Sequence, residues 1–239
     1  MKKVIIIGAT SGMGRELAKS YASAGCLICI SGRRKELLHE LQHLFPDKVS
    51  TECFDVTGNE NIVHLESMIR QLGGLDLLIY NSGFGDISKT MDWEIDKQTT
   101  LTNVNGFVEI ANYTFHFFEK QHSGQIAAIS SIASIRGNSF APAYSASKAF
   151  ISTYMEGLSI KAWRMKIPVY ITDIQPGFVR TKMAKGNQQF WVAPVDKAVR
   201  QIYSAIEKKK RRVYITHRWR IIAWIMKVLP YGLYKRIAG

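Results

Sequence analysis

A tyrosine and a lysine one helical turn apart have the clearest capacity for chemistry in this sequence. Tyr144 and Lys148 lie at positions i and i+4 of a segment with helical spacing, so their side chains share one face. A phenol with its ordinary pKa of about 10 is a poor acid–base catalyst at pH 7, and a nearby ammonium lowers that pKa by favouring the phenolate. Ser131 lies thirteen positions upstream and follows a predicted strand. Together the three residues predict proton transfer at an oxygen of a bound substrate.

A glycine-rich segment near the amino terminus supplies a second signal. Its residues are Gly8, Ala9, Thr10, Ser11, Gly12, Met13 and Gly14. Glycines between a strand and a helix let the backbone turn tightly and approach a pyrophosphate, which the free N–H groups of the helix N-terminus attract. The spacing G-x-x-x-G-x-G differs from the commoner G-x-G-x-x-G, and a purely structural turn is the alternative. Its place at the first strand–helix junction favours dinucleotide binding.

Two arginines follow the second predicted strand. In a dinucleotide-binding fold this position meets the adenosine ribose, where an acidic residue binds a free 2′-hydroxyl and an arginine accommodates a 2′-phosphate. Here Arg33 and Arg34 are present and no acidic residue is. The alternative is a solvated pair at the start of a helix. We predict NADP(H) rather than NAD(H).

The elements that must position these residues alternate along the chain. Apolar runs predict strands over 4–7, 27–30, 49–54, 75–80, 126–130, 169–174 and 213–216. Helical patterns lie between them, over 17–22, 37–44, 62–72, the early 90s to about 122, 143–166 and 196–208. Strands that are apolar along their whole length are typical of a parallel sheet covered on both faces. With right-handed crossovers this predicts an open, doubly wound α/β fold.

Composition limits the protein class and separates a body from a tail. The 239 residues are 46% hydrophobic, which is enough for a packed core. The net charge is +13, but residues 208–239 hold ten of the 32 Lys and Arg and no Asp or Glu, so the remainder carries only +3. The basicity therefore does not indicate a nucleic-acid-binding body. We expect one domain over residues 1–216 and a basic amphipathic extension over residues 217–239.

The cysteines and histidines favour a reducing compartment and no metal centre. Cys26 and Cys29 lie in an apolar strand-like run, where residues three apart point to opposite faces, and Cys53 leaves an odd count. We read them as thiols of a cytoplasmic protein. The six histidines show no metal-ligand spacing with each other or with the cysteines. No run reaches the roughly 18 apolar residues of a membrane span.

From about residue 3 to residue 215 the sequence resembles the short-chain dehydrogenase/reductase family, of the classical type. The shared positions are the glycine motif, Asp55-Val56, Asn81-Ser82-Gly83, Asn103, Ser131, Tyr144-x-x-x-Lys148, and Pro176-Gly177 with Thr181. Ser82 departs from the alanine usual in that family, which we expect to be tolerated. The resemblance implies a Rossmann-type sheet of about seven strands in three α/β/α layers.

The resemblance also implies roles for individual residues. Tyr144 would protonate the carbonyl oxygen, Lys148 would bind the nicotinamide ribose and lower the tyrosine pKa, and Ser131 would bind the substrate oxygen. Asn103, chosen over Asn105 by its spacing to Gly106, would hold a water in a proton relay to Lys148. The implied cofactor contacts are Gly8, Thr10, Ser11, Gly12, Met13, Gly14, Arg33, Arg34, Asp55, Val56, Asn81, Gly83, Tyr144, Lys148, Pro176, Gly177, Val179 and Thr181.

These observations predict an NADP(H)-dependent oxidoreductase that interconverts a carbonyl and an alcohol. The segment after Pro176 is expected to cover the substrate, with apolar candidates Met183, Phe190, Trp191, Phe84, Ile132 and Ile135. They suit a hydrophobic carbonyl compound, and Lys182 and Lys185 leave an anionic 3-oxoacyl substrate open. The alternative is a non-catalytic NADP-binding regulatory or scaffold protein of the same fold.

The partners of the extension are the least determined feature. Trp, Ile, Leu, Lys and Arg at helical spacing without acidic residues suit a helix in a membrane interface, so a cytoplasmic protein peripheral at the membrane is one reading. Packing on its own domain or across a subunit interface is another. Nucleic acid is not expected, because no reader motif is present. The family resemblance implies a homodimer or homotetramer.

Overall fold

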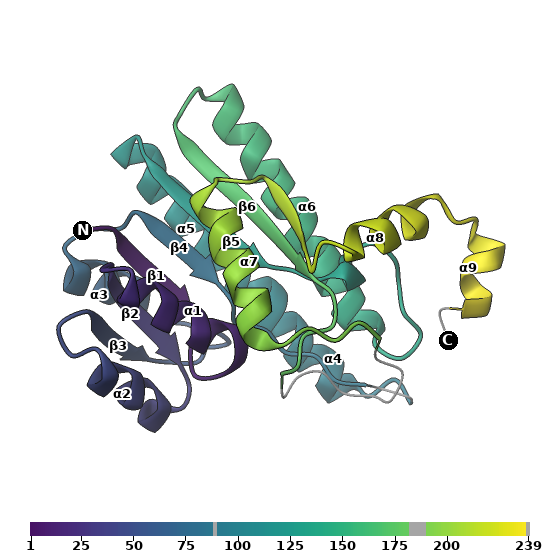
Figure 1. The fold of residues 1–239 in the computed structure, drawn as a ribbon, viewed down its shortest axis with the longest axis horizontal. Coiled ribbons are helices and arrows are strands. Elements are labelled where there is room, and N and C mark those ends of the chain that lie inside the picture. Colours follow the sequence, from purple (N-terminus) through teal and green to yellow (C-terminus); the bar gives the residue numbers. More distant parts are fainter. Residues whose placement is uncertain (88–89, 182–189, 238–239) are drawn as a thin grey trace.

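A single parallel sheet organises the chain. The computed structural model describes residues 1–87, 90–181 and 190–237. Within them the sheet has seven strands in the order β3-β2-β1-β4-β5-β6-β7, all paired in parallel (Figure 1). The strands are β1 (Lys3–Ile7), β2 (Leu27–Gly32), β3 (Val49–Cys53), β4 (Leu77–Tyr80), β5 (Gly124–Ile129), β6 (Val169–Pro176) and β7 (Arg212–Ile215). The predicted doubly wound α/β fold is confirmed.

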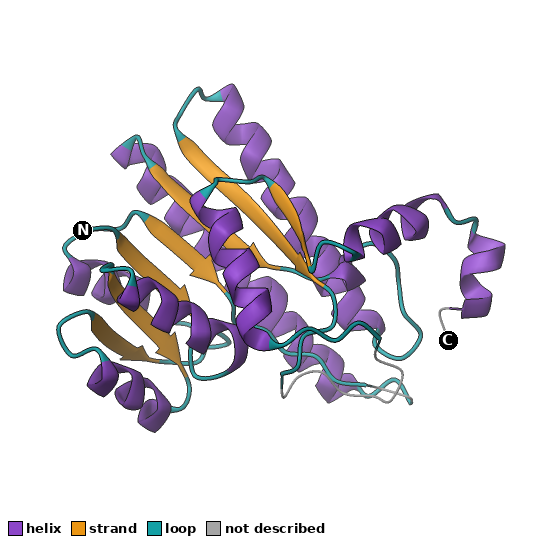
Figure 2. Ribbon diagram, viewed as in Figure 1, coloured by secondary structure: helices purple, strands orange, loops and turns teal. Residues whose placement is uncertain are grey.

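Helices cover both faces of the sheet (Figure 2). They are α1 (Gly12–Ser23), α2 (Lys35–Leu44), α3 (Asn61–Leu72), α4 (Trp93–Thr100), α5 (Gly106–Gln121), α6 (Pro142–Arg164), α7 (Val195–Glu207), α8 (Trp219–Val228) and α9 (Tyr231–Ile237). Apolar residues of α1, α2 and α7 pack on one face, and those of α3, α5 and α6 pack on the other. These layers form the predicted α/β/α arrangement.

The two cores explain why the strands lack alternation of apolar and polar residues. Along β1, Val4 and Ile6 belong to the core under α1 and α7, whereas Ile5 and Ile7 belong to the core under α5 and α6. Successive strand residues point to opposite faces, so burial on both sides demands apolar residues throughout. Cys26 and Cys29 also divide between the two cores, and the described cysteines are free thiols.

The predicted helix from the early 90s to about residue 122 is one continuous rod with an irregular middle. It begins after Asp92, whose carboxylate accepts a hydrogen bond from the Glu94 N–H at 2.9 Å. Between α4 and α5, Leu101–Asn105 forms a π-helical turn, a distortion that is frequent at functional sites. Asn103 lies in this turn and is buried.

The carboxyl end of β7 leads into two helices beside the sheet. In Figure 1, α8 and α9 lie at the end of the molecule toward which the strand arrows of β5 and β6 point. No helix in the part of the chain that the structure describes has the length and apolar character to cross a bilayer.

Candidate active site

A cleft of about 1550 Å³ opens at the carboxyl edge of the sheet. It extends from the ends of β1 and β2, past the start of α6, to α8. Open α/β sheets bind ligands at this edge where the strand order reverses, which here is between β1 and β4. A pocket for one small ligand typically measures roughly 300–1,000 Å³, so this cleft has room for a dinucleotide together with a second molecule.

The glycine turn forms one end of the cleft, and close packing explains its glycines. Gly8 and Gly12 adopt left-handed backbone angles with φ of +88° and +58°. A Cβ atom on Gly14 would lie 2.1 Å from the Gly8 carbonyl oxygen, which itself accepts a hydrogen bond from the Asn81 amide at 2.6 Å. Gly14 therefore packs beneath the turn and does not line the cleft. Thr10, Ser11, Gly12 and Met13 do line it, at the N-terminus of α1.

Both arginines lie beside this turn. The Arg34 guanidinium donates to the hydroxyls of Thr10 at 2.6 Å and Ser11 at 2.9 Å. Arg33 is largely exposed, and its contact with the Asp55 carboxylate is long, at 3.4 Å. Its guanidinium is therefore weakly held. Both side chains line the cleft, as do Asp55 and Val56. Two cations next to a helix N-terminus form an environment suited to phosphate groups.

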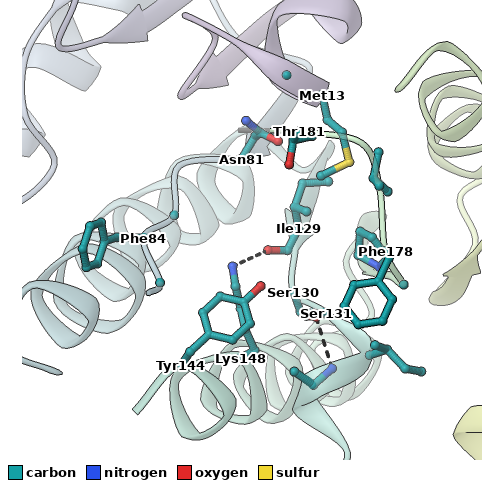
Figure 3. A pocket seen from close by; sticks show the side chains of 18 of the residues that line it. Met13, Asn81, Phe84, Ile129, Ser130, Ser131, Tyr144, Lys148, Phe178 and Thr181 are labelled. Atoms are coloured by element: carbon teal, nitrogen blue, oxygen red, sulfur yellow. Dashed lines mark hydrogen bonds between the residues drawn. The ribbon is translucent and has the colours of Figure 1, made fainter. Parts of the chain in front are cut away.

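Ser131, Tyr144 and Lys148 meet in the middle of the cleft (Figure 3). Pro142 opens α6, which places Tyr144 in the first turn and Lys148 one turn later. The Lys148 ammonium donates to the Ile129 carbonyl at 3.0 Å and lies 5.7 Å from the centre of the Tyr144 ring. The Ser131 hydroxyl oxygen accepts a bond from the Ala133 N–H at 3.1 Å, which leaves its own proton free to donate.

Burial governs the ionisation of this group. It raises the pKa of Tyr144, and a hydrogen bond from Ser131 opposes that rise. In the ligand-free protein burial is the larger effect on this pKa, and the lowering expected from Lys148 stays a prediction. Burial also lowers the pKa of Lys148 to about 8, against the opposing attraction of Asp173. Around pH 7 the phenol is protonated and the amine is charged.

Replacing Lys148 should stabilise the ligand-free protein. The lysine pKa falls from 10.5 to about 8 on folding, so at pH 7 the buried charge costs the fold about 3 kcal/mol. Lys148→Met removes that cost but leaves the Ile129 carbonyl without its donor, so we expect a net gain of about 2 kcal/mol in the free energy of unfolding at pH 7. Urea unfolding measures it.

The stability difference between Lys148→Met and the wild type should depend on pH. Between pH 8 and 10.5 the unfolded wild type binds the proton and the folded form does not, so wild-type stability rises with pH across this window. The advantage of Lys148→Met should therefore shrink to nothing by about pH 10.5. Lys161→Met, at an exposed position of α6, is the control. A Lys148→Met protein less stable than wild type at pH 7 would contradict the assignment.

Asn103 holds the loop after β4 and does not line the cleft. Its amide oxygen accepts from the Phe84 N–H at 2.8 Å, and its amide nitrogen donates to the Phe84 carbonyl at 2.7 Å and the Ser147 hydroxyl at 2.9 Å. The neighbouring Gly83 lies in the cleft, where an added Cβ would be 3.3 Å from the Lys148 ammonium. The π-helical turn thus ties this loop to α6.

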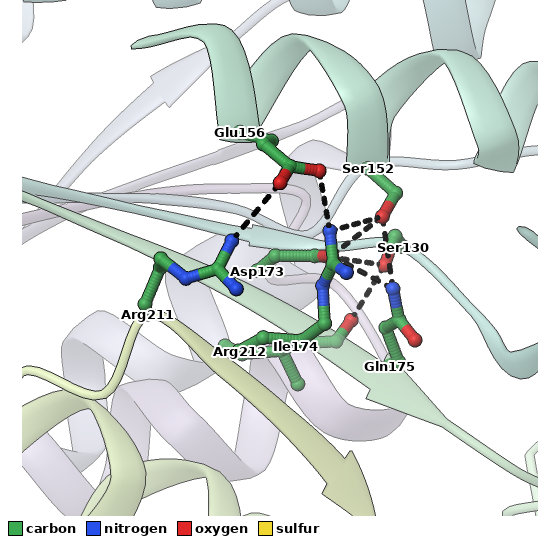
Figure 4. A network of polar contacts seen from close by, with 8 residues as sticks. All are labelled: Ser130, Ser152, Glu156, Asp173, Ile174, Gln175, Arg211 and Arg212. Atoms are coloured by element: carbon green, nitrogen blue, oxygen red, sulfur yellow. Dashed lines mark hydrogen bonds and ion pairs between the residues drawn. The ribbon is translucent and has the colours of Figure 1, made fainter. Parts of the chain in front are cut away.

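A buried polar network supports the site from the side of β6 and β7 (Figure 4). The Asp173 carboxylate accepts hydrogen bonds from Ser130, Ser152 and Gln175 and pairs with Arg212 at 3.1 Å. Ser130 therefore points toward the network, whereas Ser131, two residues after the end of β5, bonds to Tyr144. This cluster was not predicted from the sequence, although the polar residues inside the otherwise apolar β6 were the available signal.

The segment after β6 crosses the cleft. Pro176, Gly177, Val179 and Thr181, the predicted contacts of the nicotinamide end, line it. A Cβ atom on Gly177 would lie 2.1 Å from the Trp219 indole, so the glycine lets the first residue of α8 pack on this segment. The Thr181 methyl group returns to within 3.4 Å of a Cβ built on Gly12. This segment therefore joins the two ends of the cleft.

The extension forms a wall of the cleft, a position that was not predicted from the sequence. Ile222, Ile225 and Met226 line it from α8, and Leu229 lines it directly after the helix. The Arg136 guanidinium donates to the carbonyl oxygens of Met226 and Leu229, both at 3.0 Å, at the end of the helix where carbonyls lack intrahelical partners. The extension thus packs on its own domain.

The other apolar residues predicted to face the substrate do not all line the cleft. Phe84, Ile132 and Phe190 line the cleft, whereas Ile135 lines a separate hollow beside α9, so its predicted place in the cleft is wrong. Trp191 packs against Trp219, with ring centres 6.1 Å apart, and does not line the cleft. Met183, Lys182 and Lys185 lie outside the described residues.

Comparisons with known proteins agree with this architecture. The family model for short chain dehydrogenase matches residues 2–190. An uncharacterized oxidoreductase of Myxococcus xanthus is 32% identical over 195 residues, covering 78% of this chain and 75% of that protein. Another from Mycobacterium tuberculosis is 28% identical over 248 residues, covering 99% and 97%. A short chain dehydrogenase from Burkholderia cenocepacia, solved in complex with NADP, has a TM-score of 0.83 at 21% identity and full coverage of both chains.

Proposed function

The chain belongs to the short-chain dehydrogenase family, and from that premise we propose that it is an NADP(H)-dependent oxidoreductase that interconverts a carbonyl compound and an alcohol. One observation carries the proposal. Tyr144, Lys148 and Ser131 converge in the same cleft that the glycine turn and the two arginines border. A proton donor, a cation and an anion-binding turn in one cleft are the parts that this reaction requires.

The cofactor end of the cleft fits a phosphorylated dinucleotide. Gly14 and Gly32 let the turn pack closely, and Thr10, Ser11, Gly12 and Met13 line the cleft at the N-terminus of α1, where free N–H groups would face a pyrophosphate. The weakly held guanidinium of Arg33 would bind the 2′-phosphate, with Arg34 closing the other side. The solved Burkholderia cenocepacia structure, with the same fold, holds NADP. These points favour NADP(H) over NAD(H).

The residues at the centre of the cleft would transfer the proton to the substrate. Bound NADPH would supply the hydride for the carbonyl carbon. The Tyr144 phenol, kept protonated by burial, would donate its proton to the carbonyl oxygen, while Ser131 donates a hydrogen bond to the same atom. The Lys148 ammonium would stabilise the phenolate left behind. Asn103 would act as a positioning residue through Phe84 and Ser147.

The substrate end indicates a hydrophobic compound. Phe84, Ile132 and Phe190 and the inner side of α8 line it. Both a 3-oxoacyl chain and a broader ketone fit this lining. We expect homo-oligomers, as in the family, and light scattering would establish the number of subunits.

A substitution on α8 tests the substrate end. Ile222→Asp places a charge on the inner side of the helix, so we expect KM for a hydrophobic ketone to rise about tenfold, because the carboxylate must be desolvated beside the substrate. The affinity for NADPH should not change. The neighbouring Ile221 is exposed, and Ile221→Asp is the control. Equal KM values for the two variants would show that α8 does not face the substrate.

A panel of carbonyl compounds separates the proposal from its rival, a non-catalytic NADP-binding protein. The loss of NADPH absorbance with at least one aldehyde, ketone or 3-oxoacyl thioester is expected. Tight NADPH binding without turnover of any compound would favour the rival.

A further inference from the structure

We propose that the outer face of α8 and α9, together with the rim of the cleft, docks on an anionic lipid surface and opens the substrate end of the cleft toward the bilayer. The outer face is defined here by Ile221, Trp224, Val228, Tyr231 and Leu233, all of which are exposed. The docking is independent of the catalytic role. Only its consequence for the substrate depends on the proposed function.

The apolar character of the outer face has no internal explanation. The inner side of α8 is used by the fold, since Trp219 and Ala223 are buried. Trp224 and Val228 are nevertheless 65% and 59% exposed one helical turn apart. Large apolar residues at this spacing, with tryptophan and tyrosine among them, match a helix that lies at a lipid–water boundary.

The positive charge around the outer face identifies an anionic lipid surface as its partner. The exposed side chains Arg218, Arg220, Lys227, Lys235 and Arg236 flank the outer face, and residues 217–239 contain no Asp or Glu. A second copy of this chain would bring the same positive charge against it. An anionic phospholipid surface instead has the opposite charge to the basic residues, and its acyl region can accommodate the tryptophan side chain.

The rim of the cleft is apolar and exposed as well. Ile87, Phe140 and Phe190 line the cleft and are also exposed. Ile225 likewise belongs to both, because it lines the cleft and is 40% exposed. Because Ile225 belongs to both, a protein docked through α8 would bring this edge of the cleft to the bilayer. The substrate class that follows is a carbonyl compound that partitions into lipid.

Vesicle co-sedimentation of the full chain tests the docking. The wild type should pellet with vesicles of phosphatidylcholine and phosphatidylglycerol, far less with phosphatidylcholine alone, and less as salt screens the charges. The variant Trp224→Ser with Val228→Ser should bind anionic vesicles about tenfold more weakly. The matched control is Trp163→Ser with Val63→Ser, which removes the same residue types at 78% and 60% exposure on α6 and α3. It should bind like the wild type.

Two results would overturn the docking. One is equal pelleting of the variant and its control, and the other is a change of molecular mass in the variant alone, which would mean that a second copy covers α8. Turnover of a water-soluble carbonyl compound is measured on the same preparations. Turnover without vesicle binding removes the docking only, and vesicle binding without turnover removes the proposed reaction only.

Discussion

Tyr144→Phe is expected to lower kcat for carbonyl reduction by about 10³-fold and to leave the Kd for NADPH within about twofold. The substitution removes one hydroxyl from a ring that α6 holds in the cleft, so the cavity keeps its shape. The lost atom is the proton donor that we assign to the carbonyl oxygen. Steady-state NADPH oxidation measures kcat, and calorimetric titration measures the Kd.

Tyr154 offers a matched control for this prediction. It lies on the same helix, partly buried against Phe107 and Phe150. Tyr154→Phe removes the same hydroxyl away from the cleft, so kcat should stay near the wild-type value. Wild-type-like turnover by Tyr144→Phe would refute the role of the phenol. A parallel loss of NADPH affinity would mean that the hydroxyl serves binding.

Arg33→Asp should change the preference for NADPH over NADH, measured as the ratio of kcat/KM values, by about 100-fold or more. The arginine side chain is exposed beside the glycine turn, and its contact with Asp55 is long, at 3.4 Å, so little structure depends on it. The new carboxylate would repel a 2′-phosphate and accept a hydrogen bond from a free 2′-hydroxyl. Both changes favour NADH over NADPH.

A change in net charge alone must be excluded. Arg70→Asp on α3 changes the charge by the same amount at an exposed position, where the ion pair to Glu66 is long, at 3.9 Å. It should leave the preference unchanged. If Arg33→Asp also left the ratio unchanged, Arg33 would not bind the 2′-phosphate. Arg34, whose guanidinium donates to two hydroxyls beside the turn, would then be the next candidate.

The sheet was predictable because its signal is local. Residues such as Ile5 and Ile6 must both be apolar when helices cover both faces, and the glycines of the turn punctuate the first junction. The spacing of Tyr144 and Lys148 likewise places both on one helix face regardless of the rest of the fold.

Features that depend on packing between distant segments could not be predicted. The pairing of Asp173 with Arg212 follows from the register of β6 on β7. The return of α8 to the cleft depends on Gly177 beneath Trp219 and on Arg136 at the helix end. The rise in the Tyr144 pKa could not be predicted either, because charge proximity is visible in a sequence, whereas burial is not.

One measurement tests most directly whether this cleft carries out carbonyl reduction. The wild-type protein is incubated with NADPH that carries deuterium at both C4 positions and with the best carbonyl compound of the panel, and the alcohol is analysed by mass spectrometry and NMR. The proposed function predicts one deuterium on the carbon that bears the new hydroxyl. An alcohol without deuterium, or no alcohol from any compound while NADPH stays bound, would contradict it.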